Sequence, residues 1–353
     1  MMNTHGGNLR WAKQQFGDRD YLDFSANINP LGIPKTLQAS WRALLESDAL
    51  MHYPDIECTR LREAIGCMLD VSPDCILCGN GASELLGLAI KAKKPKNVLL
   101  IEPCFAGYAF AAESNQANPI RLVTNADQNF EWNIEDLDLQ RADMLVLGNP
   151  NNPTSRGMTK SKLCALLDAC HDAHVDIVVD EAFIDLTCSG VSVLDFAAQN
   201  EHVIIVRAFT KSLAIPGVRL GYAVGSGAWL RAMKADQTEW SVNVFAQAVA
   251  EVLPDLADYQ SKTRAWLMQT VPAYKKQMDQ IRHLSGYEPQ CNFMLWHFDG
   301  KEPHILAEKM AKKGVLIRSC QNFYGLNERY FRTAIRFEEE NNRLFAALQC
   351  CLE

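Results

Sequence analysis

Residues 142–181 read ADMLVLGNPNNPTSRGMTKSKLCALLDACHDAHVDIVVDE, and their pattern of apolar and polar residues indicates the fold class. The apolar runs at 142–147 and 175–179 have the length and residue types of buried strands. Between them, apolar residues recur at helical spacing over 159–173, and Thr159 stands where a helix N-cap belongs. The stretch therefore predicts a strand, a helix and a second strand, which is the βαβ unit of a parallel sheet.

Further strand-length runs flank this unit at 97–101, 202–206 and 219–224. Short apolar strands that alternate with helical stretches predict an α/β fold with a mostly parallel, buried sheet. The spacing turns helical from 229 to 278, and mixed strands and helices close the chain as a smaller α+β domain. The predicted division is an N-terminal arm with part of the small domain (1–45), a large domain (46–248) and a small C-terminal domain (249–353).

Composition limits the partners and the location of the protein. The 353 residues carry 35 Lys and Arg against 42 Asp and Glu, a net charge of −7, which argues against nucleic acid or a membrane surface as partner. The N-terminus lacks a signal peptide, and no apolar run approaches the roughly 18 residues of a membrane span. We therefore expect a cytoplasmic protein.

The cysteines do not indicate a disulfide scaffold or a metal site. Twelve of them are scattered along a long chain. Cys75 and Cys78 have CxxC spacing, but no second pair stands near them to complete a zinc site. We expect two core thiols there and no metal.

Four polar motifs follow predicted strands, at the edge where an open α/β sheet binds its ligands. The turn at 79–84 leads into a helix, so its backbone N–H groups and the Ser83 hydroxyl suit a phosphate. Asn152 is the donor of a rigid, proline-rich loop, and Asp180 is a carboxylate at the end of an apolar strand that requires a cationic partner. Lys211 stands at the next strand end as a Schiff-base candidate. Together they describe a site for pyridoxal 5'-phosphate.

In these motifs the chain resembles the fold-type-I pyridoxal phosphate enzymes of the histidinol-phosphate aminotransferase-like group, over nearly its whole length. Within that group, His5-Gly6-Gly7-Asn8, the segment 22–32 (LDFSANINPLG) and the segment 317–320 (IRSC) are similar to the L-threonine-O-3-phosphate decarboxylases of cobalamin biosynthesis. The resemblance implies decarboxylation of L-threonine O-3-phosphate to (R)-1-amino-2-propanol O-2-phosphate. It also implies a homodimer with shared active sites and a small phosphorylated amino acid as substrate.

The resemblance implies a role for each cofactor-binding residue. Lys211 would hold the cofactor and Asp180 would pair with its pyridine nitrogen. Asn152 would meet its phenolic oxygen. Phe105 matches the aromatic residue that stacks on the ring, and Tyr53 matches a tyrosine that reaches the neighbouring subunit's phosphate. The residues that would surround the cofactor phosphate are Gly81, Ala82, Ser83, Thr210 and Arg219.

The substrate's two anionic ends call for two cations. Alternation along a strand over 330–336 would place Arg332 and Arg336 on one face, and guanidinium groups suit carboxylate and phosphate. The resemblance implies that Arg332 binds the α-carboxylate and that Arg336 lies at the substrate phosphate. The predicted substrate-binding residues are His5, Asn27, Tyr108, Asn152, Arg332 and Arg336.

Three positions depart from the pattern of the group. Many relatives have tyrosine where Phe183 stands, which removes one hydrogen bond to the phenolic oxygen. Many have serine at the position of Ala208, which removes a hydroxyl from the cofactor phosphate, a loss of about 1 kcal/mol if uncompensated. The usual glycine after Thr154 is replaced by Ser155.

Two alternatives stay open. An aminotransferase acting on histidinol phosphate would use the same cofactor motifs, with a proton shift in place of decarboxylation. A non-catalytic, cofactor-binding regulator on the same fold would need an added DNA-binding module, which the acidic chain does not indicate.

Overall fold

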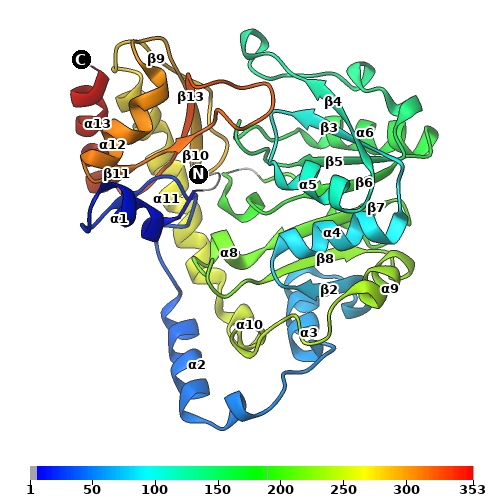
Figure 1. Cartoon of the computed structure of the whole chain (residues 1–353). Coiled ribbons are helices and arrows are strands. Elements are labelled where there is room, and N and C mark those ends of the chain that lie inside the picture. The colour runs from blue at the N-terminus through cyan, green and yellow to red at the C-terminus, as the bar shows by residue number, and fades with distance from the viewer. Residues whose placement is uncertain (1–5, 189, 353) are drawn as a thin grey trace.

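The computed structural model describes residues 6–188 and 190–352, and a seven-stranded sheet dominates it (Figure 1). The strand order is β2-β8-β7-β6-β5-β3-β4. Strands β4, β3, β5, β6 and β7 run parallel, whereas β8 is antiparallel to both of its neighbours. The bounds are β2 Ile76–Gly79, β3 Asn97–Glu102, β4 Asn118–Val123, β5 Met144–Gly148, β6 Asp176–Asp180, β7 Val203–Ala208 and β8 Gly221–Gly225.

The predicted βαβ unit is confirmed. Strand β5 pairs in parallel with β6, and α6 (Lys160–Asp172) connects them. The Thr159 hydroxyl caps the helix by accepting the Lys162 N–H at 3.2 Å. Edge strand β4 was not predicted, because its half-buried run contains Pro119 and Arg121 and lacks the apolar signature of the central strands.

Successive side chains of the central strands point to opposite faces, and helices bury both faces. On β5, Leu145 and Leu147 join a core with α3 and α6, whereas Met144 and Val146 join a core with α4, α5 and α9. The helices of the large sheet are α2 Lys35–Glu46, α3 Thr59–Leu69, α4 Ala82–Lys93, α5 Gly107–Ser114, α6 Lys160–Asp172, α7 Leu194–Ala197, α8 Phe209–Ser212, α9 Gly227–Asp236 and α10 Val244–Gln247.

A second, smaller body joins the two ends of the described chain. It contains an antiparallel sheet of order β12-β13-β10-β9, and a short parallel pair of β1 with β11. Figure 1 shows the blue N-terminal segment beside the orange and red C-terminal elements. The bounds are α1 Leu9–Phe16, β1 Leu22–Asp23, α11 Ala257–Met278, β9 Leu284–Gly286, β10 Phe293–Phe298, α12 Leu306–Lys312, β11 Val315–Leu316, β12 Arg318–Ser319, β13 Tyr330–Ala334 and α13 Glu338–Leu352.

These layers confirm the predicted fold class, an α/β protein with a mostly parallel sheet and a smaller α+β part. The division at 46–248 and 249–353 remains our proposal. Within the predicted N-terminal arm, β1 packs with the small body, whereas Leu37 of α2 is buried in the core of the large sheet.

Cys75 and Cys78, which we expected to be two core thiols, lie outside the site. Cys75 is half-buried and donates to the Ala198 carbonyl at 3.7 Å, whereas Cys78 is buried near Cys58. Over the described ranges, no helix combines the length and apolar character that a membrane crossing requires.

Candidate active site

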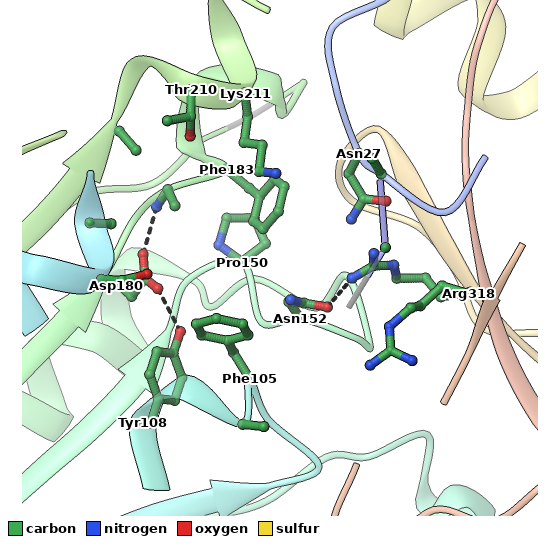
Figure 2. Close-up of a pocket in the computed structure, with 18 of the residues that line it drawn as sticks. Asn27, Phe105, Tyr108, Pro150, Asn152, Asp180, Phe183, Thr210, Lys211 and Arg318 are labelled. Carbon is green, nitrogen blue, oxygen red and sulfur yellow. Dashed lines mark hydrogen bonds between the residues drawn. The ribbon is translucent and has the colours of Figure 1, made fainter. Parts of the chain in front are cut away.

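A pocket opens at the carboxyl ends of the large sheet's strands, where loops of that sheet face the small body (Figure 2). Figure 2 shows Asp180 and Tyr108 on one side of it, Asn27 and Arg318 on the opposite side, and Lys211 between them. The predicted residues that line the pocket are Asn27, Ala82, Ser83, Phe105, Tyr108, Asn152, Asp180, Thr210, Lys211, Arg219 and Arg332.

One end of the pocket carries hydrogen-bond donors of the kind that a phosphate accepts. Helix α4 begins at Ala82, so the backbone N–H groups of its first turn and the Ser83 side chain face the pocket. Gly81 has φ +80, and a Cβ there would collide with the guanidinium of Arg219. Glycine is needed at this position because the Arg219 guanidinium lies directly against the turn.

Lys211 lies on α8, one turn after strand β7, and its side chain points into the pocket (Figure 2). Among the described residues it forms no ion pair with a carboxylate. Burial lowers the pKa of its amine to about 8, and the neighbouring charges of Arg332 and Arg219 add to the effect. The amine is therefore far more available as a nucleophile near neutral pH than an ordinary lysine.

Asp180 ends β6 and is held by two donors. Its Oδ2 accepts the Tyr108 hydroxyl at 2.8 Å, and its Oδ1 accepts the Ala182 N–H at 2.9 Å. Burial raises the pKa of this carboxyl, whereas both hydrogen bonds lower it. The structure thus gives Tyr108, which we predicted as a substrate contact, a different partner for its hydroxyl: the carboxylate of Asp180.

Phe105 forms the wall beside this carboxylate. Its ring meets Tyr108 edge to face, with centroids 5.6 Å apart. Gly107 gives the Phe105 ring its room, since a Cβ at Gly107 would collide with it. The ring lies between Tyr108 and Asn152 in Figure 2.

Asn152 is oriented from the opposite side. Its Oδ1 accepts a hydrogen bond from Arg332 Nη1, while Arg332 Nη2 donates to the Ser25 carbonyl at 2.9 Å. Because the carboxamide oxygen is engaged, the amide Nδ2 is the end turned toward the pocket (Figure 2). The Asn152 amide can therefore donate a hydrogen bond to a ligand in the pocket.

Ser155 explains how the loop manages without its usual glycine. It adopts φ +62, the left-handed conformation in which glycine is favoured. Its buried Oγ accepts the N–H groups of Gln290 and Cys291, each at 3.1 Å. These bonds tie the Asn152 loop to the small body and offset the conformational cost of about 1–2 kcal/mol.

Two arginines meet on the small sheet, and one of them was not predicted. Arg318 of β12 is the direct cross-strand partner of Arg332 of β13, and both are buried in the pocket wall. Burial lowers the pKa of Arg318, and burial together with the charge of Arg318 lowers the pKa of Arg332 to about 10. The only sequence signal for Arg318 was its place in the segment 317–320, which we compared but did not assign a role.

The predicted position of Arg336 was wrong. Strand β13 ends at Ala334, so the alternation that would place Arg336 beside Arg332 does not continue. Arg336 instead donates from Nε and Nη2 to Glu340 Oε1, at 2.9 and 2.6 Å, and it does not line the pocket. The cross-strand neighbour Arg318 takes the place that we expected for Arg336.

The N-terminal segment closes the pocket on the side of the arginines. A Cβ at Gly6 would collide with the Ser25 carbonyl, and the Gly7 N–H donates to Ser25 Oγ at 2.8 Å. Asn27 is buried, and neither atom of its side-chain amide has a hydrogen-bond partner within the described residues. Such an orphaned amide indicates a polar ligand. The predicted His5 lies outside the described residues.

Tyr53 does not reach this pocket. Its side chain is 80% exposed and stacks on Trp240, with ring centroids 4.6 Å apart. The departures Phe183 and Ala208 both line the pocket, and Phe183 packs edge to face on Phe293.

Comparisons with known proteins place the chain in a family. The chain matches the family model "Aminotransferase class I and II" over residues 19–348. Threonine-phosphate decarboxylase of Salmonella typhimurium is 34% identical over 356 residues, which cover 98% of this chain and 96% of the relative.

Solved structures show the same fold. Histidinol-phosphate aminotransferase from Clostridium acetobutylicum aligns with a TM-score of 0.87 at 30% identity, over 93% of this chain and 98% of that one. L-Threonine-O-3-phosphate decarboxylase from Porphyromonas gingivalis shares the fold, with a TM-score of 0.84 at 23% identity over the same shares of the two chains. Since the family model spans nearly all of the sequence, the protein belongs to the class I and II aminotransferase family.

Proposed function

We propose that the protein is a decarboxylase of L-threonine O-3-phosphate that uses pyridoxal 5'-phosphate and yields (R)-1-amino-2-propanol O-2-phosphate for cobalamin biosynthesis. The observation that carries the proposal is the cross-strand pair Arg318 and Arg332, buried together opposite Lys211. Two buried guanidinium groups on one pocket wall suit a ligand that carries two anionic groups. A phosphorylated amino acid supplies two anions, whereas histidinol phosphate supplies one.

The pocket residues fit the cofactor. A buried amine, a helix N-terminus with an arginine, and a buried carboxylate held by two donors stand at separate points of one cavity. They match the aldehyde, the phosphate and the pyridine nitrogen of pyridoxal 5'-phosphate. Lys211, Arg219 and Asp180 would therefore hold it, with Asn152 at the phenolic oxygen and Phe105 on the ring. Bound there, the cofactor supplies an electron sink for the pair released when the Cα–carboxylate bond breaks.

Residues of the pocket determine which bond at Cα of the substrate breaks. Arg332 is fixed by Asn152 and the Ser25 carbonyl, so its guanidinium is positioned before a substrate arrives. We assign it to the α-carboxylate, because a carboxylate held at this point fixes the direction of the Cα–carboxylate bond. Arg318 and the amide of Asn27, which has no hydrogen-bond partner within the described residues, then bind the phosphate.

Lys211 also handles the proton. With a pKa of about 8, its amine is protonated in part near neutral pH and can deliver a proton to Cα after carbon dioxide leaves. The aromatic wall of Phe105, Phe183 and Phe323 keeps water from the reacting carbon.

We further propose that the active form is a homodimer. Tyr53 is exposed together with Leu50 and Met51, and the Tyr53 ring lies on Trp240. An exposed apolar patch of this kind suits a subunit interface. Light scattering of the wild type and of Tyr53→Ala tests this: we expect twice the chain mass for the wild type, and a monomeric wild type would contradict the dimer.

The assay that tests the activity uses no keto acid. The holoenzyme is incubated with L-threonine O-3-phosphate, and carbon dioxide and the phosphorylated amino alcohol are measured. We expect both in equal amounts with no added amine acceptor.

The alternative is an aminotransferase, favoured by the 30% identity to the Clostridium acetobutylicum structure. Two arginines would also suit an amino-acid donor with two carboxylates. The companion reaction therefore contains histidinol phosphate and 2-oxoglutarate. Glutamate formation there, without carbon dioxide release from threonine phosphate, would replace the decarboxylase by the aminotransferase.

A further inference from the structure

The Tyr108 hydroxyl points away from the substrate side of the pocket. It donates to Asp180 Oδ2 at 2.8 Å, and the side chain is 2% exposed. Burial raises the pKa of this phenol well above its usual value, so the group stays a donor at every working pH.

The surroundings of Tyr108 fix this contact from three directions. Helix α5 carries the residue, the Phe105 ring meets it at 85°, and Gly148 at the end of β5 leaves room for the hydroxyl. A Cβ at Gly148 would lie only 3.0 Å from the Tyr108 oxygen. The hydroxyl therefore has one position, which is on the Asp180 carboxylate.

We infer that Tyr108 is a positioning residue: it orients the Asp180 carboxylate and keeps it ionised toward the cofactor's ring nitrogen, and it is not a ligand of the substrate. The Tyr108 hydroxyl donates to Oδ2 and the Ala182 N–H donates to Oδ1, so both carboxylate oxygens are held and the orientation of the carboxylate plane is fixed. Burial alone would favour the neutral acid, and a neutral acid could not hold a proton on the ring nitrogen by charge. The inference rests on the proposed cofactor site.

Tyr108→Phe removes only the hydroxyl. We expect the dissociation constant of pyridoxal 5'-phosphate to rise about ten- to a hundredfold, because a hydrogen bond to a buried charge is lost. The nitrogen-15 shift of the labelled cofactor's ring nitrogen should move toward the unprotonated form at a lower pH than in the wild type. In turnover, kcat should fall, while the KM for threonine phosphate changes less than about threefold.

Two further variants separate positioning from a structural role. Tyr274→Phe removes another buried phenol, whose hydroxyl bonds to Thr333 at 2.6 Å in the small body's core, and it should leave cofactor affinity and the nitrogen-15 shift unchanged. In an Asp180→Asn background, Tyr108→Phe should alter cofactor affinity by less than about threefold, because the charge on which it acts is gone.

The outcomes decide between the roles. A raised KM with unchanged cofactor affinity would make Tyr108 a substrate ligand. If the effects of Tyr108→Phe and Asp180→Asn on cofactor affinity were fully additive, Tyr108 would be a packing residue. The same conclusion would follow if Tyr108→Phe lowered thermal stability without changing cofactor affinity or the nitrogen-15 shift. Each of these results overturns the inference. Failure of the wild type to bind pyridoxal 5'-phosphate would instead refute the proposed cofactor site.

Discussion

The two sides of the pocket are built in different ways. On the cofactor side, Asp180, Lys211 and Asn152 follow neighbouring parallel strands, and Asp180 is satisfied within the protein by two donors. The substrate side joins residues from the two ends of the chain, Asn27 and the arginines of β12 and β13.

The difference extends to hydrogen bonding. On the substrate side, Asn27 keeps both amide atoms and Arg332 keeps its Nε without a partner within the described residues. Unpaired buried polar atoms are costly, and a ligand with matching groups recovers that cost. The cofactor side is therefore prepared in the folded chain, whereas the substrate side is completed by what binds there.

The largest effect is expected when the nucleophile of the cofactor side, Lys211, is removed. Lys211→Ala should lower turnover about a thousandfold or more and abolish the absorbance band of the covalent link between Lys211 and the cofactor, because no other amine lines the described pocket. Absorbance spectra and a carbon dioxide assay measure both effects. A variant that keeps the band and the turnover would refute the assignment of Lys211.

On the substrate side, the next largest effects are expected from the two pocket arginines. Arg318→Gln and Arg332→Gln should each lower kcat/KM about a hundredfold, since a desolvated charge pair worth about 2–5 kcal/mol is lost. Arg336→Gln should change it less than about threefold, because this guanidinium is bound to Glu340 outside the pocket. Steady-state kinetics with threonine phosphate measure kcat/KM for the three variants. An Arg336→Gln variant as weak as Arg318→Gln would restore the discarded prediction.

Gly6 tests whether the N-terminal segment belongs to the substrate side alone. In Gly6→Ala, the methyl group would displace the Ser25 carbonyl, which accepts from Arg332. We expect kcat/KM to fall about ten- to a hundredfold, since small shifts of a positioned group cost rate, with cofactor affinity unchanged. The matched control is Gly87→Ala, where the added methyl meets nothing within 4 Å. Loss of cofactor affinity in Gly6→Ala would show that the N-terminal segment acts on the cofactor side as well as on the substrate side.

The cofactor side could be predicted from the sequence because each of its functional residues lies next to its own strand along the chain. Each strand is an apolar run, and each functional residue follows its strand directly, so Asn152, Asp180 and Lys211 could be identified one motif at a time. Even the missing glycine at Ser155 could be noticed, although its compensating bonds to Gln290 and Cys291 could not.

The substrate side depends on register between strands, which no single segment encodes. Arg318 and Arg332 meet only because β12 pairs with β13 in one particular alignment. The alternation rule suggested Arg336 instead, and it failed where β13 ended two residues earlier, at Ala334. The Tyr108 hydroxyl was likewise unpredictable, because its partner Asp180 lies 72 residues further along the chain.

The pH dependence of cofactor capture connects the two sides. Burial, together with Arg332 and Arg219, lowers the Lys211 pKa to about 8, so only the neutral amine fraction above that value reacts freely. The rate at which the apoprotein captures pyridoxal 5'-phosphate should therefore fall about tenfold per pH unit below 8 and level off above it. Stopped-flow absorbance measures the profile. Arg332→Gln should move the midpoint upward, and an unchanged midpoint would show that Arg332 does not act on Lys211.

Phe183→Tyr should produce the smallest effect, a modest gain in affinity for the cofactor. The Phe183 ring lines the pocket on Phe293, so an added hydroxyl would enter the cavity where relatives of the group carry a donor to the phenolic oxygen. One added hydrogen bond of about 1 kcal/mol should tighten cofactor binding about fivefold, as equilibrium titration of the apoprotein can measure. Since the substrate side is untouched, the KM for threonine phosphate should stay constant. Weaker cofactor binding would mean that Asn152 alone already satisfies the phenolic oxygen and that the hydroxyl is buried without a partner.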